Sequence, residues 1–181
     1  MKLRTKLGLA LISLFTVLSI AGIAYALNSM TVSLSPTTPP GGNISATSTS
    51  VALAAFDLTS ASTTPNAKID KITIKNFGNS SSTPNIFSKL YLYDNDTLIA
   101  STTQAISNSY FVFKNFDYPV ASGATKTLTV KADLGSGATV GQTITLGLAH
   151  HWSVRVWDQL TGAIIDLLGN FPIMANTFTI Q

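Results

Sequence analysis

The pattern that decides the fold lies at residues 142–156, QTITLGLAHHWSVRV. Apolar side chains occupy most of the even positions of this stretch, whereas the odd positions hold small or polar residues. Successive side chains of a β-strand point to opposite faces, so the alternation predicts one long strand with an apolar face. A strand of this length needs a second layer to cover that face. We therefore expect a two-layered β structure with residues 142–156 at its centre.

The rest of the chain repeats this alternation in shorter segments, which are separated by turns rich in Gly, Pro and Ser. The pattern predicts about nine short strands. They lie at 29–35, 51–59, 69–76, 88–93, 97–102, 109–116, 126–134, 142–156 and 171–181. No segment after residue 26 has a helical period. The predicted fold class is all-β, an Ig-like antiparallel β-sandwich preceded by an N-terminal hydrophobic leader helix.

The charge of the chain is concentrated at its N-terminus. Three of the 11 Lys and Arg residues lie within the first six positions, and the other eight balance the eight Asp residues. The chain from residue 27 therefore has no net charge, and no basic patch indicates a nucleic-acid partner. The absence of Cys excludes disulfides, thiolate zinc sites and a Cys nucleophile. A hydroxyl-rich surface with few charges favours an extracellular or cell-surface location.

Residues 1–26 have the parts of a signal peptide: a basic start, an apolar run at 7–24 and a closing Ala-Tyr-Ala sequence. We predict cleavage after Ala26. Two alternatives stay open. Residues 7–27 are long enough to span a bilayer as a retained anchor helix. A prepilin-like cut near residues 6–8 would instead keep the apolar helix as the core of a filament.

The predicted N-terminal strand is followed by a stretch of different composition. Met30, Val32 and Leu34 share one face of the strand. Residues 36–50, PTTPPGGNISATSTS, hold three Pro and two Gly among Ser and Thr, which is typical of a flexible linker or long loop. The predicted domain organisation is a leader at 1–26, an N-terminal strand plus linker at 27–50 and a β-sandwich domain at 51–181.

A strand on a flexible tether can leave its own sheet and complete the sheet of a neighbour. We therefore take Met30, Val32 and Leu34 as candidate assembly residues that would enter the core of the next subunit. The alternative is that this strand pairs within its own domain. Three Lys side chains are expected to protect the remaining sheet edges against random pairing: Lys71, Lys75 and Lys131.

Five stretches carry a resemblance to a known family. They are STSVALAAFDLT at 48–59, IDKITIKN at 69–76, LYLYD at 90–94, PVASGATKTLTVKAD at 119–133 and FPIMANTFTI at 171–180. Over residues 30–181 the chain resembles a β-sandwich module of secreted surface proteins of bacteria and archaea, which often occurs in tandem. The resemblance implies a surface location and supplies no catalytic motif. A weaker resemblance links the chain to camelysin-like biofilm fibre subunits. The single copy of the module here favours self-assembly.

No residue pattern predicts a catalytic, cofactor or metal site. The sequence lacks a GxSxG motif, a phosphate-binding glycine loop and an HExxH motif. His150 and His151 are adjacent, so in a strand they point to opposite faces and cannot chelate one ion; His150 is expected on the apolar face. Residues 94–96, DND, resemble the start of a calcium loop but lack its later Gly and Glu. They predict a hairpin turn, with an exposed low-affinity calcium contact as the alternative.

Four aromatic side chains raise the question of a carbohydrate-stacking strip: Tyr91, Tyr93, Trp152 and Trp157. Packing in the core and between neighbouring strands is the alternative explanation of these rings. Three Asn residues begin glycosylation sequons: Asn43, Asn79 and Asn95. All three fall in predicted loops or turns, where a glycan can sit, but such sequons also arise by chance in a Ser/Thr-rich chain.

These features predict a non-enzymatic extracellular structural protein, a subunit of a cell-surface filament or layer that assembles through its N-terminal strand. The alternatives are a pilin-like subunit that keeps its N-terminal helix and an adhesive or carbohydrate-binding surface module. We expect the main partner to be the protein itself, with cell-wall glycan as a second candidate. No cofactor and no nucleic acid is expected. Membrane contact is expected only through residues 7–27, if they are not cleaved.

Overall fold

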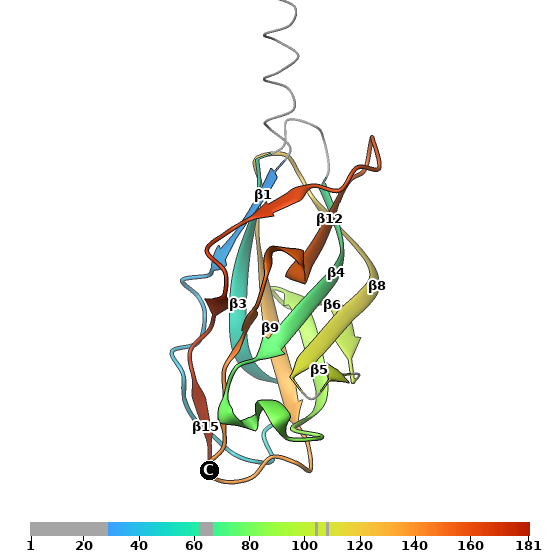
Figure 1. Ribbon diagram of the computed structural model, residues 1–181. Coiled ribbons are helices and arrows are strands. Elements are labelled where there is room, and N and C mark those ends of the chain that lie inside the picture. Colours follow the sequence, from blue (N-terminus) through green and yellow to red (C-terminus); the bar gives the residue numbers. More distant parts are fainter. Residues whose placement is uncertain (1–28, 62–66, 104, 108) are drawn as a thin grey trace, which may run out of the picture.

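The computed structural model describes residues 29–61, 67–103, 105–107 and 109–181. The predicted leader, with its cleavage site and its hydrophobic helix, lies outside these residues. Within the described ranges no helix is long and apolar enough to cross a membrane. The regular structure in those ranges consists of strands and short 3-10 turns, so the all-β class is confirmed (Figure 1).

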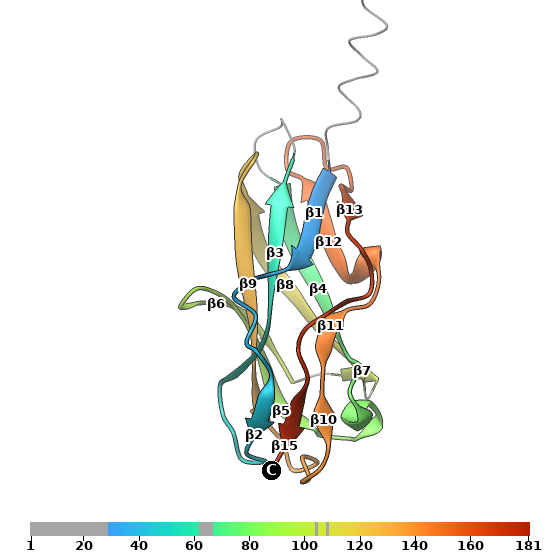
Figure 2. The same cartoon turned by 90° about the vertical axis from the view of Figure 1, so that its left-hand side faces the viewer.

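Two sheets lie face to face and form the body of the molecule (Figures 1 and 2). The first sheet has the strand order β13 (Asp166–Leu168), β1 (Ser29–Leu34), β3 (Val51–Ser60), β9 (Thr125–Leu134), β5 (Phe87–Asp94) and β6 (Thr97–Thr102). The second sheet has the order β14 (Ile173–Met174), β11 (Leu146–Leu148), β4 (Ala67–Asn76), β8 (Tyr110–Val120) and β7 (Ala105–Ser107), and β12 (Val154–Asp158) also pairs with β4. A third, small sheet has the order β10 (Thr143–Ile144), β15 (Phe178–Ile180) and β2 (Gly42–Ile44).

Most strand pairs are antiparallel, as predicted, but two are parallel. β1 runs parallel to β13, and β2 runs parallel to β15. In both pairs a strand from the N-terminal part of the chain lies beside one from the C-terminal part. Parallel neighbours need a long connection, and in this protein most of the domain supplies it.

The core lies between the two large sheets and follows the alternation of the strands. β9 contributes Leu128 and Val130 from the first sheet, and β4 contributes Ile72 and Ile74 from the second. Full burial of such a side chain stabilises the folded chain by about 1.5–3 kcal/mol. The side chains that alternate with them, such as Thr129 and Lys131, face outward and are only partly buried.

The stretch at 142–156 is not the single strand that its alternation predicts. It forms β10, β11, the 3-10 helix η3 (His151–Ser153) and β12. β11 pairs with the C-terminal end of β4, and β12 pairs with the N-terminal part of the same strand. The chain therefore follows β4 and leaves it for a short excursion at 149–153.

The excursion turns His150 and Trp152 outward. The backbone N–H of Ser153 donates to the carbonyl of His150 (2.9 Å), and the Ser153 hydroxyl accepts a bond from the N–H of His150 (3.1 Å). These two bonds close the turn. Leu148 before it and Val154 after it remain buried, whereas His150 and Trp152 are exposed. The prediction that His150 lies on the apolar face is wrong, because the turn rather than the strand period sets its direction.

The stretch at 36–50, which was predicted as a flexible linker, contains β2 and is tied to the body of the domain. The hydroxyl of Thr38 donates to the carbonyl of Ala55 (2.7 Å), and the amide of Asn176 donates to the carbonyl of Pro39 (2.7 Å). The N–H of Ala46 donates to the carbonyl of Gln181 (3.2 Å). Ser and Thr side chains give this stretch polar partners that its composition alone does not reveal.

Candidate assembly interface

β1 is an N-terminal strand that occupies an interior position of the first sheet (Figure 2). It pairs antiparallel with β3 through Met30 to Leu34 and parallel with β13 through Ser29 to Thr31. The strand therefore fills a slot between two strands that come from distant parts of the sequence. Removal of β1 would expose the backbone edges of β3 and β13. The structure thus supports the alternative in which the strand pairs within its own chain.

The side chains of β1 alternate as predicted over most of its length. Met30 is 0% exposed and Val32 is 2% exposed, and both belong to the core. Thr31 and Ser33 point to solvent. Leu34, the third predicted assembly residue, is 36% exposed and lies at the rim. Two of the three candidate residues thus enter the core, and they enter the core of their own chain.

A groove continues the slot beyond the end of β13. It is lined by Thr31 to Leu34 on one side and by Gly169, Asn170 and Ile173 on the other. The N–H of Ser35 donates to the carbonyl of Ala55, and the N–H of Ala61 donates to the carbonyl of Ser29. The odd-numbered residues of β1 therefore form the backbone hydrogen bonds to β3. In an antiparallel ladder the backbone groups of Val32 and Leu34 then point away from β3. Because β13 reaches only as far as Thr31, Leu34 presents its backbone to the groove.

The sheet borders are not protected by the predicted Lys residues. Lys71 and Lys75 lie on β4, and Lys131 lies on β9; both strands are in the interior of their sheets. Within the described residues β6 forms one border of the first sheet, and its sequence TLIAST has no charge. The prediction failed because the period of a strand identifies its faces but not its neighbours.

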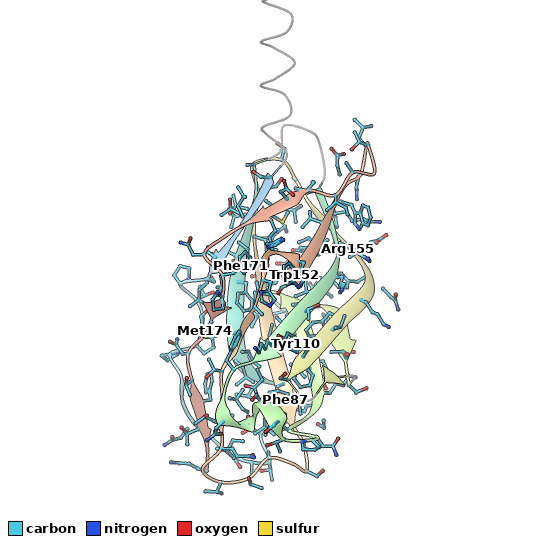
Figure 3. All side chains as sticks on the ribbon, in the orientation of Figure 1. Phe87, Tyr110, Trp152, Arg155, Phe171 and Met174 are labelled. Carbon is cyan, nitrogen blue, oxygen red and sulfur yellow. The ribbon has the colours of Figure 1, made fainter. Side chains whose placement is uncertain are left out.

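A polar and aromatic cluster joins β4 to β12 on the solvent-facing side of the second sheet. Arg155 donates Nε to Oδ1 of Asp70 (2.7 Å) and Nη2 to Oδ2 (2.8 Å), and Trp157 donates Nε1 to the same Oδ2 (2.9 Å). Figure 3 shows Arg155 projecting from the strand. A second ion pair, between Lys68 and Asp117 (3.0 Å), lies on the same sheet. Arg155 and Trp157 lie 85 and 87 residues from Asp70 in the sequence, and sequence reasoning missed the cluster.

The electrostatics of this cluster keep its carboxylate ionised. Partial burial alone would raise the pKa of Asp70, but the hydrogen bonds from Arg155 and Trp157 and the charge of Arg155 outweigh it, so the pKa lies below its usual value. The hydrogen bond to Asp70 raises the pKa of Arg155. A carboxylate with three donors is a poor general base, so the arrangement cross-links strands rather than moving protons.

The four predicted aromatic residues do not form one strip. Tyr91 and Tyr93 lie on β5 in the first sheet with ring centroids 6.3 Å apart, and Tyr91 donates its hydroxyl to Asp133 (2.6 Å). Trp157 lies on β12 in the second sheet, and Trp152 lies in η3. The tyrosines therefore lie on the first sheet, whereas Trp157 lies on the second sheet and Trp152 lies in a turn outside both.

Trp152 is instead the centre of a small exposed aromatic group (Figure 3). The ring of His150 stacks on it with centroids 4.3 Å apart. The ring of His151 meets it edge-on at 4.6 Å. The two His residues thus come together on one aromatic ring in a turn, rather than on opposite faces of a strand.

The predicted turn at 94–96 joins β5 to β6. Its Asp94 carboxylate accepts hydrogen bonds from the hydroxyl of Tyr118 (2.6 Å) and from Lys126 (3.3 Å). Burial and the bond to Asp94 raise the pKa of the Tyr118 phenol well above its usual value. Among the described residues no group of three His or Asp side chains could hold a metal ion. Asp94 serves as an anchor between strands.

The three sequon asparagines are exposed. Asn43 lies on β2, and Asn95 occupies the β5–β6 turn with a positive φ of 52°. Asn79 begins the 3-10 helix η2 (Asn79–Ser82), where its Oδ1 accepts a bond from the N–H of Thr143 (2.6 Å). Exposure leaves glycosylation at these residues as a prediction.

No protein-family model matches the sequence, and no curated protein matches it significantly.

Several solved structures align with most of the chain. A type I cohesin of ScaB from Pseudobacteroides cellulosolvens is 8% identical, with a TM-score of 0.36, over 84% of this chain and 92% of that one. CssB of enterotoxigenic Escherichia coli colonization factor CS6, complemented with a donor strand from CssA, is 9% identical, with a TM-score of 0.36, over 84% and 97%. AvmM, which catalyses macrocyclization in alchivemycin A biosynthesis, is 11% identical, with a TM-score of 0.41, over 84% and 89%. At TM-scores below 0.5 these similarities do not identify a function.

Proposed function

We propose that the protein is a non-enzymatic structural protein of the cell exterior that forms filaments or layers by exchanging β1 between copies. The observation that supports this function is the position of β1, an N-terminal strand that fills an interior slot between β3 and β13. In the assembly, β1 of one subunit occupies the same slot in the next, and Met30 and Val32 make the same core contacts there. Exchange of an identical element between protomers is a low-cost route to oligomers.

The closed and the exchanged forms compete through the segment that follows β1. In the closed form the hydrogen bonds of Thr38, Ala46 and Asn176 hold this segment against its own domain. In the exchanged form its 15 residues, 36–50, bridge up to about 50 Å. An intrachain strand acts at an effective concentration on the order of millimolar. Exchange is therefore favoured where subunits are crowded, as they are at a surface.

The other parts of the proposal come from the sequence. The extracellular location is inferred from the N-terminal leader and the charge-poor, hydroxyl-rich composition of the chain. Its non-enzymatic character is inferred from a sequence without a catalytic motif, and in the structure Asp70 and Asp94 are engaged with cationic and aromatic partners. The partner that fits this arrangement best is another copy of the chain.

The test uses the chain at 27–181 and a version that lacks residues 27–35. The shortened domain should be soluble and should form no filaments in electron microscopy. The free peptide MTVSLSP, residues 30–36, should bind it, because the peptide restores both buried side chains of the slot.

A matched pair of variants separates the slot from general effects of charge. Val32→Asp places a charge in the core of the acceptor and should prevent polymerisation. Thr31→Asp changes the neighbouring, solvent-facing position and should leave polymerisation intact. If the shortened domain still polymerises normally, strand exchange is wrong and assembly occurs between outer surfaces.

A further inference from the structure

Two large aliphatic side chains are exposed together on one hairpin of the domain. Leu160 is 75% exposed and Ile164 is 66% exposed. Both lie in the loop that connects β12 to β13, which projects beyond the body of the sandwich (Figure 1). No residue from 159 to 165 is charged. Ile164 pairs with Trp157 at the base of this hairpin, and Leu160 lies in the turn beyond them. Isolated exposed aliphatics are ordinary, but two on one projecting hairpin need a reason.

The loop is held in a defined shape. Oδ1 of the buried Asp158 accepts hydrogen bonds from the backbone N–H groups of Leu160 (2.8 Å) and Thr161 (3.2 Å). The N–H of Asp158 donates to the carbonyl of Ala163 (2.8 Å), and Gly162 supplies the positive φ of 69° that the turn requires. The outward direction of Leu160 is therefore part of the folded structure.

The hairpin lies at the end of the domain where the N-terminal segment joins it. β1 and β13 are parallel, and Ser29 pairs with Asp166, so both strands start at the same end. Only five steps of chain lead from Ala24, the last residue of the apolar run, to Ser29. Fully extended they span at most about 17 Å. An apolar run placed in a bilayer would therefore keep this end of the domain close to the lipid.

We propose that, in the chain that keeps residues 7–24, the hairpin tip contacts the bilayer surface through Leu160 and Ile164. The contact goes beyond the proposed assembly function, because its partner is lipid and it uses neither β1 nor its slot. A projecting, uncharged tip with aliphatic side chains suits a fluid lipid surface, which deforms around it, better than a rigid partner, which would need a matching pocket. The second contact would fix the tilt of the domain on the membrane.

The experiment uses the full chain, residues 1–181, reconstituted in phosphatidylcholine–phosphatidylglycerol vesicles. Since the sequence contains no Cys, Leu160→Cys gives a single site for a spin label. The matched control is Val140→Cys. Val140 is also 75% exposed but lies beside the C-terminus, where the N–H of neighbouring Gly141 donates to Ile180. Collision rates with oxygen, which concentrates in lipid, and with a water-soluble nickel complex report the surroundings of each label.

The label at position 160 should collide with oxygen several-fold more, and with the nickel complex several-fold less, than the label at position 140. Replacing Ile164 with Ser in the Leu160→Cys chain should reduce this difference, since it removes the aliphatic side chain that remains on the hairpin. Equal nickel access at both positions would overturn the inference. Shielding of position 160 from both reagents would also overturn it, because a protein would then cover the tip. Filament formation is measured separately on residues 27–181, so failure of one proposal leaves the other standing.

Discussion

Truncation of Met30 tests directly whether β1 completes the core. Met30 is among the largest fully buried side chains, and Met30→Ala removes its thioether from the slot between β3 and β13. Such a truncation costs about 2–5 kcal/mol, the transfer energy of the lost atoms plus the cavity. Since a domain of this kind has a total stability of about 5–15 kcal/mol, the loss is a large fraction of it. Thr31→Ala, on the exposed side of the same strand, should change the stability by less than about 0.5 kcal/mol.

The assay is urea unfolding of residues 27–181, followed by the fluorescence of the two Trp residues. With a slope of about 2 kcal/mol per molar urea, Met30→Ala should lower the unfolding midpoint by roughly 1–2.5 M. The measurement is repeated at rising protein concentration. The closed monomer unfolds at a midpoint independent of concentration, whereas the strand-exchanged polymer gains stability with concentration.

Three results would refute this reasoning. Equal losses in Met30→Ala and Thr31→Ala would show that the two faces of β1 are assigned wrongly. A wild-type midpoint that stays constant up to concentrations at which polymers form would show that β1 is not exchanged in them. A loss near zero for Met30→Ala would remove β1 from the core altogether.

Three further predictions concern the remainder of the domain. Leu146→Ala should cost about 2–5 kcal/mol in urea unfolding, and Thr145→Ala, which loses an exposed hydrogen bond to another Thr, should cost well under half of that. Asn76→Ala should cost about 2–3 kcal/mol in urea unfolding. The buried Oδ1 of Asn76 accepts hydrogen bonds from two backbone N–H groups, which would lose their acceptor. Asp70→Asn should cost about 0.5–1 kcal/mol at neutral pH, since the pair with Arg155 is partly exposed. Because folding lowers the pKa of Asp70, the stabilisation is fully present above the unfolded-state pKa of about 4 and is lost as the pH falls through the folded-state pKa. The difference in unfolding free energy between the wild type and Asp70→Asn should therefore disappear at low pH.

The faces of the strands were predictable from sequence because side-chain alternation is a local property of an extended chain. Val130 and Leu146, which occupy alternating apolar positions of the segments at 126–134 and 142–156, are both fully buried. Met30 and Val32 were likewise placed on an inward face, and they are buried. The same period could not show that His150 leaves its strand, because a turn closed by Ser153 interrupts the alternation without changing the pattern of apolar residues.

The sequence by itself determined the all-β class, the inward faces of the strands and the net charge of zero from residue 27 onward. Only the tertiary structure decided which strands are neighbours. It placed β1 between β3 and β13, put Lys71 and Lys131 on interior strands and joined Asp70 to Arg155 across 85 residues. The physical reason is that strand faces follow from adjacent residues, whereas pairing is settled by long-range hydrogen bonds and packing, for which many segments of similar composition compete.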